Sequence, residues 1–164
     1  AIAWTRAAYK RSYKTECGAL HLCISHRKRR RINAELQEAF SVDKTFVRIQ
    51  ANDGEPEYRC TPGTPLVGSC TGHKFVNGAF YETLCIDGLK VRDKLTDEVI
   101  ETTPELLARH CCLAWAVVYH RAQGLTVSDQ KVVLHDFRSK FFSRPHLYVG
   151  LSRVTAGANI RIAD

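Results

Sequence analysis

The fold of this chain is decided by Leu113-Ala-Trp-Ala-Val-Val-Tyr-His-Arg-Ala-Gln-Gly-Leu-Thr126. Its first part, Leu113–Val118, is a continuous apolar run, which is typical of a strand buried inside a sheet. His120, Arg121 and Gln123 follow that run, although a buried strand has no packing reason to end in hydrogen-bonding side chains. In open α/β sheets, ligands bind at the carboxyl ends of the strands. The stretch therefore predicts an α/β fold with a ligand-binding segment at one edge of its sheet.

A second stretch, Leu147-Tyr-Val-Gly-Leu-Ser-Arg153, combines apolar residues with a terminal arginine. We expect a helix over residues 144–154. Its predicted buried stripe consists of Leu147, Leu151 and Val154. Gly150 and Arg153 then lie together elsewhere on the helix, because residues three apart are neighbours. The small residue leaves the guanidinium room to reach across an interface; the alternative is a surface arginine in an ordinary salt bridge.

Taken in this order and about 30 residues apart, the two stretches resemble motifs V and VI of superfamily 1 helicases. The likeness is closest to the RecD- and PIF-like branch, whose segments look like T-[IV]-H-[KR]-[SA]-Q-G and L-[YF]-V-[AG]-L-S-R. The ordered pair is more specific than either segment, because chance seldom supplies two matches at a fitting distance. Many members carry lysine where this chain has Arg121, a change that keeps the charge but alters the geometry.

The basic run His26-Arg-Lys-Arg-Arg-Arg31 stands at the start of a predicted helix over residues 28–40. A helix N-terminus favours anions, so five positive charges there work against the local rule. Locally disfavoured choices often mark functional sites. The surrounding segment Ile24–Asn33 resembles motif IV of the same helicases, [ST]-[NH]-[KR] followed by a helix with a later asparagine. The alternatives are a solvated basic face and a nuclear-localisation signal.

The resemblance implies a role for the polar residues of the three segments. Arg153 corresponds to an arginine finger, which stabilises negative charge on the departing γ-phosphate and is worth about 10³–10⁵ in rate in other NTPases. Nucleotide contacts are implied for Arg27, Gln123 and Gly124. Nucleic-acid contacts are implied for His26, Arg29, Arg30, Arg31, His120 and Arg121. For His120 the alternative is a satisfied strand-end histidine.

The rest of the pattern predicts a RecA-like parallel sheet flanked by helices, with a small antiparallel β insert. Ile32, Leu36 and Phe40 recur every four residues and form one apolar helical stripe. Further core strands are expected at residues 19–25, 131–135 and 160–163, and a short helix or turn after Pro104. Hairpin signals at Asn77-Gly78 and Asp87-Gly88 punctuate expected strands at 79–86, 89–92 and 98–102.

These elements predict two domains. The RecA-like domain takes residues 1–59 and 104–164, with residues 1–18 as a connector, and the insert takes residues 60–103. The resemblance supports this division, since the helicase branch commonly carries a small SH3-like insert between motifs IV and V.

The nucleotide site is expected to be half of a complete site. No G-x₄-G-K-[ST] phosphate loop is present in the sequence, because residues 68–74 have the wrong spacing and lack a hydroxyl after their lysine. No Asp-Glu pair follows a strand to hold Mg²⁺. The resemblance therefore implies that ATP and Mg²⁺ are bound mainly by an N-terminal RecA-like domain of the same parent protein. We expect the chain, which has no methionine, to be a piece of that parent and to be inactive alone.

The amino-acid composition indicates which kind of partner and which cellular compartment to expect for this chain. Residues 1–50 hold 11 of the 24 lysines and arginines but 4 of the 17 acidic residues, so the net charge of +7 is concentrated there. Such a local excess predicts a polyanionic partner. Seven cysteines, several of them in apolar runs, fit buried thiols in a reducing intracellular compartment (nucleus, cytoplasm or viral replication site).

Membrane and metal partners are not expected. No apolar run approaches the roughly 20 residues of a membrane span. The Cys/His groupings, such as Cys60, Cys70 and His73, lack the paired spacing of structural zinc ligands.

The sequence therefore predicts the C-terminal motor domain of an ATP-dependent DNA helicase or translocase that acts on single-stranded DNA, with 5′ to 3′ polarity implied by the resemblance. One alternative is an RNA helicase of the plus-strand virus type, whose motifs look similar (H-x-x-Q-G and A-L-[ST]-R). The other is a stand-alone basic nucleic-acid-binding module without ATPase activity. A phosphate loop upstream of this chain would distinguish the motor from the module.

Overall fold

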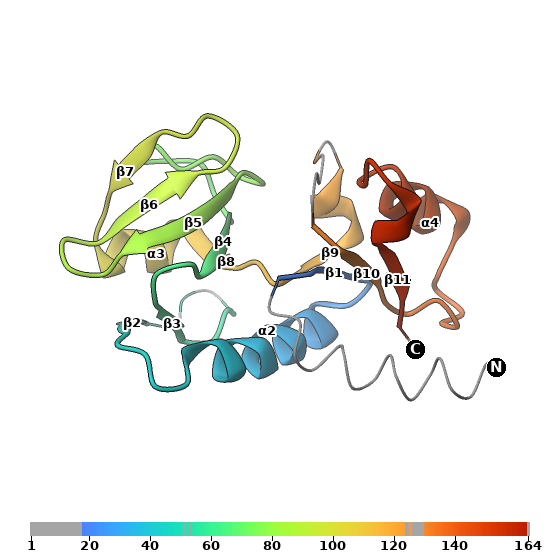
Figure 1. Cartoon of the computed structure of the whole chain (residues 1–164), viewed down its shortest axis with the longest axis horizontal. Helices are drawn as coiled ribbons and strands as arrows, with labels where there is room; N and C mark the ends of the chain where they lie inside the picture. The colour runs from blue at the N-terminus through green and yellow to red at the C-terminus, as the bar shows by residue number, and fades with distance from the viewer. Residues whose placement is uncertain (1–17, 51, 53, 124, 126–129, 164) are drawn as a thin grey trace. The chain divides into compact units, whose positions relative to one another are not determined.

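The computed structural model describes residues 18–50, 52, 54–123, 125 and 130–163. The chain divides into two compact units, drawn in Figure 1. One unit combines the described parts of Ala1–Leu36 and Trp115–Asp164, and the other is Gln37–Ala114. The predicted connector lies almost entirely outside the described residues. The second unit covers more residues than the predicted 60–103 insert. It also includes strands before residue 60 and a helix and a strand after residue 103.

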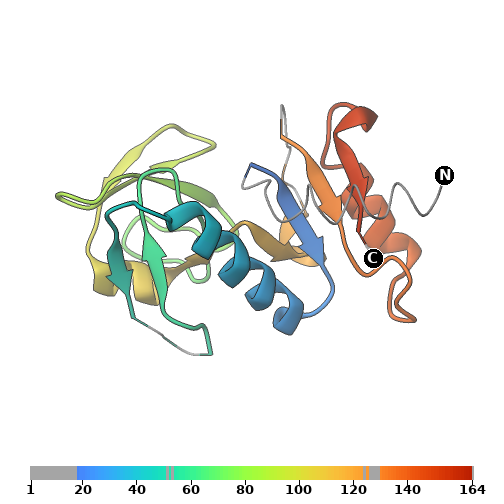
Figure 2. The ribbon, with the colours of Figure 1, turned by 60° about the horizontal axis from the view of Figure 1, so that its bottom comes forward.

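The first unit is built on a four-stranded parallel sheet. Its strands are β1 (Leu20–Cys23), β9 (Ala116–Val118), β10 (Val132–Leu134) and β11 (Ile160–Ile162). They lie in the order β11-β10-β1-β9 (Figure 2), and each neighbouring pair is parallel. Every residue of β1, β9 and β10 is buried, as expected of a parallel sheet covered by helices. The predicted α/β fold class is confirmed.

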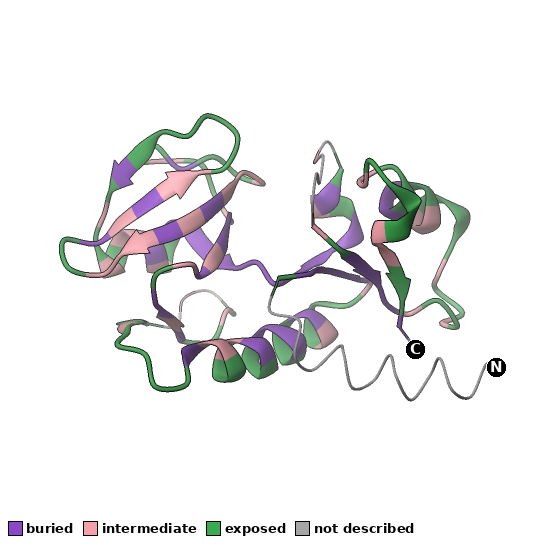
Figure 3. Ribbon diagram, viewed as in Figure 1, coloured by how far each residue is buried: buried purple, intermediate pink, exposed green. Residues whose placement is uncertain are grey.

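Among its described residues, the first unit has the α-helices α2 (His26–Ser41) and α4 (Arg144–Leu151) and the 3₁₀-helices η1 (Tyr119–Ala122) and η2 (Gly157–Asn159). Ser25 starts α2, because its Oγ accepts a hydrogen bond from the Lys28 N–H at 3.2 Å, an N-cap contact. Ile32 and Leu36 are 0% and 2% exposed, as the helical stripe predicted, and Figure 3 shows the buried side of α2. None of the helices in the described residues has the length and hydropathy that a membrane crossing requires.

The second unit is mainly an antiparallel sheet in the order β7-β6-β5-β4-β8. Its strands are β4 (Pro65–Gly68), β5 (Phe80–Cys85), β6 (Lys90–Asp93), β7 (Val99–Glu101) and β8 (Cys111–Leu113), beside a separate ribbon of β2 (Val47–Ile49) and β3 (Tyr58–Cys60). Helix α3 (Pro104–His110) precedes β8. The insert strands predicted at 79–86, 89–92 and 98–102 correspond to β5, β6 and β7. The predicted hairpin glycines, Gly78 and Gly88, adopt positive φ angles of 85° and 63°.

The predicted strand Leu113–Val118 is wrong as one element. Its first residue ends β8, which pairs with β4, whereas β9 begins at Ala116 and pairs with β1. Between the strands, Ala114 N–H donates to Pro65 O at 3.0 Å, and Trp115 O accepts from His21 N–H at 2.8 Å. Both strands are fully buried, so hydropathy does not mark the point at which the chain passes from one sheet to the other.

Candidate nucleotide and nucleic-acid interface

Polar segments follow three adjacent strands of the parallel sheet. Ile24 and Ser25 lead from β1 into α2, η1 follows β9, and His135–Asp136 follow β10. Because β1 is parallel to both β9 and β10, their carboxyl ends meet at one edge of the sheet. Ligands of α/β proteins bind at such an edge. The structure thus brings together the segments that resemble motifs IV and V.

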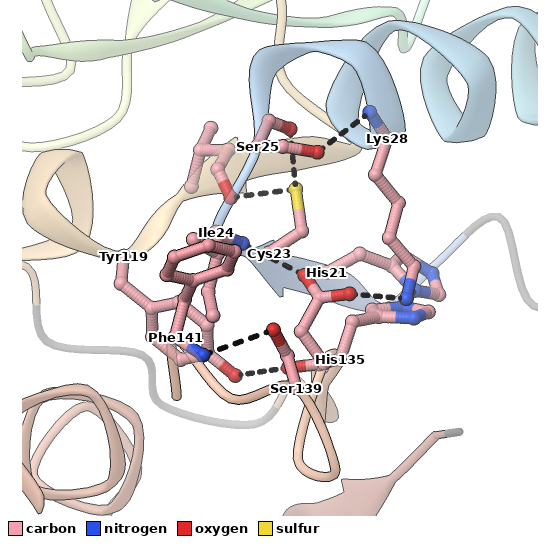
Figure 4. A network of polar contacts seen from close by, with 11 residues as sticks. His21, Cys23, Ile24, Ser25, Lys28, Tyr119, His135, Ser139 and Phe141 are labelled. Carbon is pink, nitrogen blue, oxygen red and sulfur yellow. Dashed lines mark hydrogen bonds and ion pairs between the residues drawn. The ribbon is translucent and has the colours of Figure 1, made fainter. Parts of the chain in front are cut away.

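An ion pair that the sequence analysis missed holds this edge together. Lys28 Nζ lies 2.6 Å from Asp136 Oδ1, and the Ile24 N–H donates to Asp136 Oδ2 at 2.9 Å (Figure 4). Burial raises the pKa of Asp136, but the hydrogen bonds from Ile24 and Lys28 together outweigh burial, so the pKa lies below its ordinary value. The carboxylate ties the end of β10 to the start of α2. The available signal was an acidic residue directly after a predicted strand.

Two buried histidines meet at the same edge. His21 Nδ1 and His135 Nε2 lie 3.0 Å apart, so one ring donates a hydrogen bond and the other accepts it. Burial, with smaller contributions from His21 and Lys28, lowers the pKa of His135 to about 3. Tyr119 Oη donates to His135 O at 2.9 Å, which anchors the residue that precedes His120.

The buried His135 makes the domain sensitive to acid. Its pKa is about 3 in the folded chain and about 6.5 when unfolded, so the unfolded chain takes up the proton first as the pH falls. Linkage therefore predicts that the free energy of unfolding falls by about 2 kcal/mol between pH 7 and pH 5. Asp136 does not contribute in this window, because its depressed pKa acts below its ordinary value of 3.8.

Urea unfolding of wild type and His135→Asn at the two pH values checks this prediction. The variant should lose most of the pH dependence, whatever its stability at pH 7. An equal loss of stability on acidification in both proteins would contradict the role of His135.

The basic start of α2 consists of an exposed set, the half-buried Lys28 and one buried arginine. The exposed members are His26, Arg27, Arg30 and Arg31. Arg29 is 4% exposed, because it shares the buried face of the helix with Ile32 and Asn33, three and four residues further on. That burial removes Arg29 from the accessible contacts to a nucleic acid, contrary to its predicted role. The helical period, rather than the charge run, decides which arginines reach solvent.

His26 and His120 bring the segments resembling motifs IV and V into contact. Their ring centroids are 6.5 Å apart with an edge-on interplanar angle of 69°, and both side chains are exposed. Arg121 is half-buried, and Gln123, whose N–H contacts His120 O at 3.4 Å, has an exposed side chain. Gly124 lies outside the described residues. Imidazole N–H groups are donors, so the histidine pair is suited to phosphate oxygens.

Arg153 joins the segments resembling motifs V and VI. It lies beyond α4, which ends at Leu151 rather than at the predicted Val154. Arg153 Nη1 donates to Leu125 O at 2.8 Å, and Nη2 donates to Ser152 Oγ at 2.8 Å. Within the described part of the chain, no carboxylate forms an ion pair with Arg153. The alternative of a surface salt bridge therefore has no support from the described residues.

The Arg153 guanidinium retains donors that fit an anion. It has five N–H groups, and one N–H on Nη1 and one on Nη2 have no acceptor among the residues that the structure describes. Guanidinium N–H groups are well suited to the oxygens of a phosphate. The residues present thus fit a phosphate group of a nucleotide.

The buried side of α4 differs from the prediction. Val149 and Gly150 are buried, whereas Leu151 is 46% exposed. A Cβ on Gly150 would lie 2.6 Å from Leu134 Cδ2, so the glycine lets α4 pack directly on β10. Gly150 therefore positions the helix that leads to Arg153.

Asn33, the later asparagine of the segment that resembles motif IV, has a structural role that the sequence analysis did not assign. Its Nδ2 donates to Ala116 O at 3.0 Å and its Oδ1 accepts from Ala116 N–H at 2.8 Å. Ala116 starts β9, an edge strand of the parallel sheet, and Asn33 takes the place of a further strand at this residue. The amide thereby holds α2 beside the strand that leads to His120. A polar residue on the apolar face of the predicted helix was the available signal.

The described cysteines are free thiols without a metal cluster. Burial raises the pKa of Cys23 and Cys60 to about 12, so both remain protonated at neutral pH. Exposed Cys70 has its Sγ 3.1 Å from His110 Nδ1. In the described ranges, no three His, Cys, Asp or Glu side chains gather as metal ligands.

Comparison with known proteins connects the chain to helicases. Over 68 residues it is 43% identical to the ATP-dependent DNA helicase PIF5 of Trypanosoma brucei brucei (strain 927/4 GUTat10.1), a match that covers 42% of this chain and 7% of PIF5. No protein-family model matches the chain.

Solved structures with a similar fold are Pif1 helicases. A structure of two coordinating Pif1 helicases at forked double-stranded DNA has a TM-score of 0.63 at 19% identity, over 93% of this chain and 42% of that one. Candida albicans Pif1 has a TM-score of 0.61 at 15% identity, over 90% and 45%. Bacteroides Pif1 in complex with ADP-AlF3 and ssDNA has a TM-score of 0.59 at 16% identity, over 93% and 44%.

The sequence match and the structural matches agree, and they confirm the predicted likeness to a superfamily 1 helicase domain. At identities of 15–19% the structural matches carry the fold alone. The chain spans less than half the length of these solved helicases and 7% of PIF5. The roles of individual motif residues remain predictions.

Proposed function

We propose that this chain, a domain resembling Pif1-like superfamily 1 helicases, is the second motor domain of an ATP-dependent DNA helicase or translocase. It supplies Arg153 as the arginine finger and provides part of the single-strand binding surface. The observation that carries the proposal is the hydrogen bond from Arg153 Nη1 to Leu125 O, because it joins two segments identified separately by their likeness to motifs V and VI. The PIF5 relative is named a DNA helicase, which favours DNA over RNA.

Nucleotide binding is proposed to be shared with a first domain of the parent protein. The Bacteroides relative was solved with ADP-AlF3. This chain has neither a phosphate loop nor an Asp-Glu pair directly after a strand, since Asp97-Glu98 lies in the connection between β6 and β7. ATP supplies the phosphoryl group whose transfer to water drives the motor. Arg153 contacts that group and stabilises its developing negative charge. Gln123, Gly124 and Arg27 provide the further contacts that the resemblance implies.

The strand-binding surface and the nucleotide contact share one short segment. His120 lies five residues before Leu125, whose carbonyl holds Arg153. His26 and His120 contact the strand's phosphates, as do Arg30 and Arg31 of α2. A movement of Arg153 toward a nucleotide is thereby passed to His120 through the backbone, and this coupling moves the strand. The six free thiols described agree with a reducing intracellular compartment.

A salt titration tests the strand-binding surface. Each phosphate contact on a single strand contributes a slope of about −0.7 in log affinity against log salt. The double variant Arg30→Gln/Arg31→Gln should therefore flatten the slope for oligo(dT) by about 1.4. Arg29 is left unchanged, because its burial would mix a packing effect with the charge effect. Fluorescence anisotropy at several salt concentrations measures the slope.

A matched control is Lys94→Gln/Arg109→Gln, which removes two exposed cations from the second unit. It lowers the net charge equally and should leave the slope close to that of wild type. If both double variants flatten the slope alike, binding follows net charge and the α2 surface is not the site.

A further inference from the structure

The segment between β10 and α4 carries exposed aromatic rings among basic residues. Phe137 is 42% exposed and Phe141 is 67% exposed. Lys140 and Arg144 are exposed, and Lys140 Nζ lies 5.1 Å from the Phe141 ring centroid. From residue 137 to residue 163 the sequence has five basic residues and no acidic residue. We call residues 137–144 the aromatic loop.

The aromatic loop is built onto the edge of the sheet. Phe142 packs against Tyr119 and Phe137, with ring centroids 5.7 Å and 5.3 Å apart. His146, in the first turn of α4, lies 5.2 Å from the Tyr119 ring and closes a capping box with Ser143. Tyr119 directly precedes His120. The loop is therefore fixed to the segment that the proposed function assigns to strand binding.

Phe142 packs the loop against its neighbours, whereas Phe141 does not contribute to that packing. Phe141 exposes most of its ring, although its N–H contacts Ser139 Oγ at 3.2 Å and so fixes its backbone. Neither Lys140 nor Arg144 has a carboxylate partner in the described part of the chain. An exposed ring flanked by such cations is the arrangement that stacks on a base while it contacts the adjoining phosphates.

We propose that the aromatic loop is a base-stacking platform for single-stranded nucleic acid, in which Phe141 stacks on a base and Lys140 and Arg144 contact phosphates. The inference rests on the proposed function, since it assumes that the domain binds a single strand. It adds a contact to the base faces, which the phosphate contacts of His26, His120 and α2 do not provide. Affinity should therefore depend on the presence of bases.

Two probes of equal length separate stacking from charge: oligo(dT) and an abasic oligonucleotide with the same number of phosphates. The 164-residue chain should bind oligo(dT) about 5- to 150-fold more tightly for each stacked base. Phe141→Leu should weaken oligo(dT) binding at least about fivefold and leave abasic binding unchanged. Lys140→Gln should weaken both probes equally. Fluorescence anisotropy gives the affinities, and circular dichroism confirms folding.

A matched control is Phe46→Leu in the second unit. Phe46 is also exposed, at 37%, and also lies beneath a cation, with Arg59 Cζ 5.0 Å from its ring centroid. This variant should bind both probes as wild type does. In a second measurement, oligo(dT) containing 5-iodouracil should crosslink on irradiation to a peptide that spans residues 137–144, and Phe141→Leu should remove that product.

The outcomes separate this inference from the proposed function. If Phe141→Leu binds oligo(dT) normally while Arg30→Gln/Arg31→Gln weakens binding, the platform is wrong and the helicase surface stands. Equal losses on both probes would assign the loop to charge alone and overturn stacking. If wild type binds neither probe, both proposals fail.

Discussion

Replacing Arg153 by alanine in the intact parent protein should lower kcat for ATP by about 100-fold or more, with little change in single-strand affinity. The reason is the geometry of the guanidinium. Leu125 O and Ser152 Oγ hold it at 2.8 Å each, and one N–H on each terminal nitrogen is left for a phosphate. An interaction made mainly with transition-state charge affects turnover rather than ground-state binding. Steady-state ATPase kinetics with saturating oligo(dT) measure the effect.

Two further variants sharpen the test. Arg153→Lys keeps the charge but loses the fork, so its turnover should stay well below that of wild type. Arg161→Ala is a matched control, because Arg161 is an exposed arginine of the same unit whose Nη1 also contacts carbonyls, Ala158 O and Ile160 O. It should turn over normally. If Arg153→Ala hydrolysed ATP with the wild-type kcat, Arg153 would be an ordinary surface arginine and not an arginine finger.

Asn33→Leu should lower the free energy of unfolding by roughly 2–5 kcal/mol. Leucine keeps the branched shape of the side chain but removes both hydrogen-bond partners of Ala116, whose N–H and C=O are buried at the sheet edge. An unsatisfied buried backbone group costs about 1–3 kcal/mol. Two are lost together here. Urea unfolding followed by far-UV circular dichroism and tryptophan fluorescence measures the change, since Trp115 is buried directly beside Ala116.

Glu35→Leu serves as the control on the same helix. Its side chain is 49% exposed and contacts Arg31 at 3.8 Å, an exposed pair whose loss should change stability by no more than about 0.5 kcal/mol. Similar losses in both variants would contradict a specific role for the Asn33 hydrogen bonds, because leucine is a better helix former than asparagine. A loss confined to Asn33→Leu assigns the effect to the edge of β9.

Local pattern was enough to predict most elements and the family likeness. The stripe of Ile32 and Leu36 predicted α2, because a period of about 3.6 residues is visible in any helix that buries one face. The apolar runs that became β1 and β10 were visible for a similar reason, since strands of a parallel sheet are apolar on both faces. The polar ends of two runs marked the segments that contain His120 and Arg153.

Other features depend on which distant residues meet. The run from Leu113 to Val118 is uniformly apolar, so only its pairing with β4 and β1 shows that it serves two sheets. The burial of Arg29 follows from the orientation of α2 on the sheet. The contact of Lys28 with Asp136 joins residues 108 positions apart.

By itself the sequence determined an α/β fold, the likeness to Pif1-like helicases and the segments that carry candidate chemistry. Those features depend on residue type and on short-range periodicity, both of which can be read directly from the amino-acid sequence. Only the tertiary structure decided that Arg153 is held by Leu125 O, that Asn33 completes the edge of β9 and that Phe141 projects from a packed loop. Each of these depends on a side chain's partner or exposure, which is set when the strands and helices pack together.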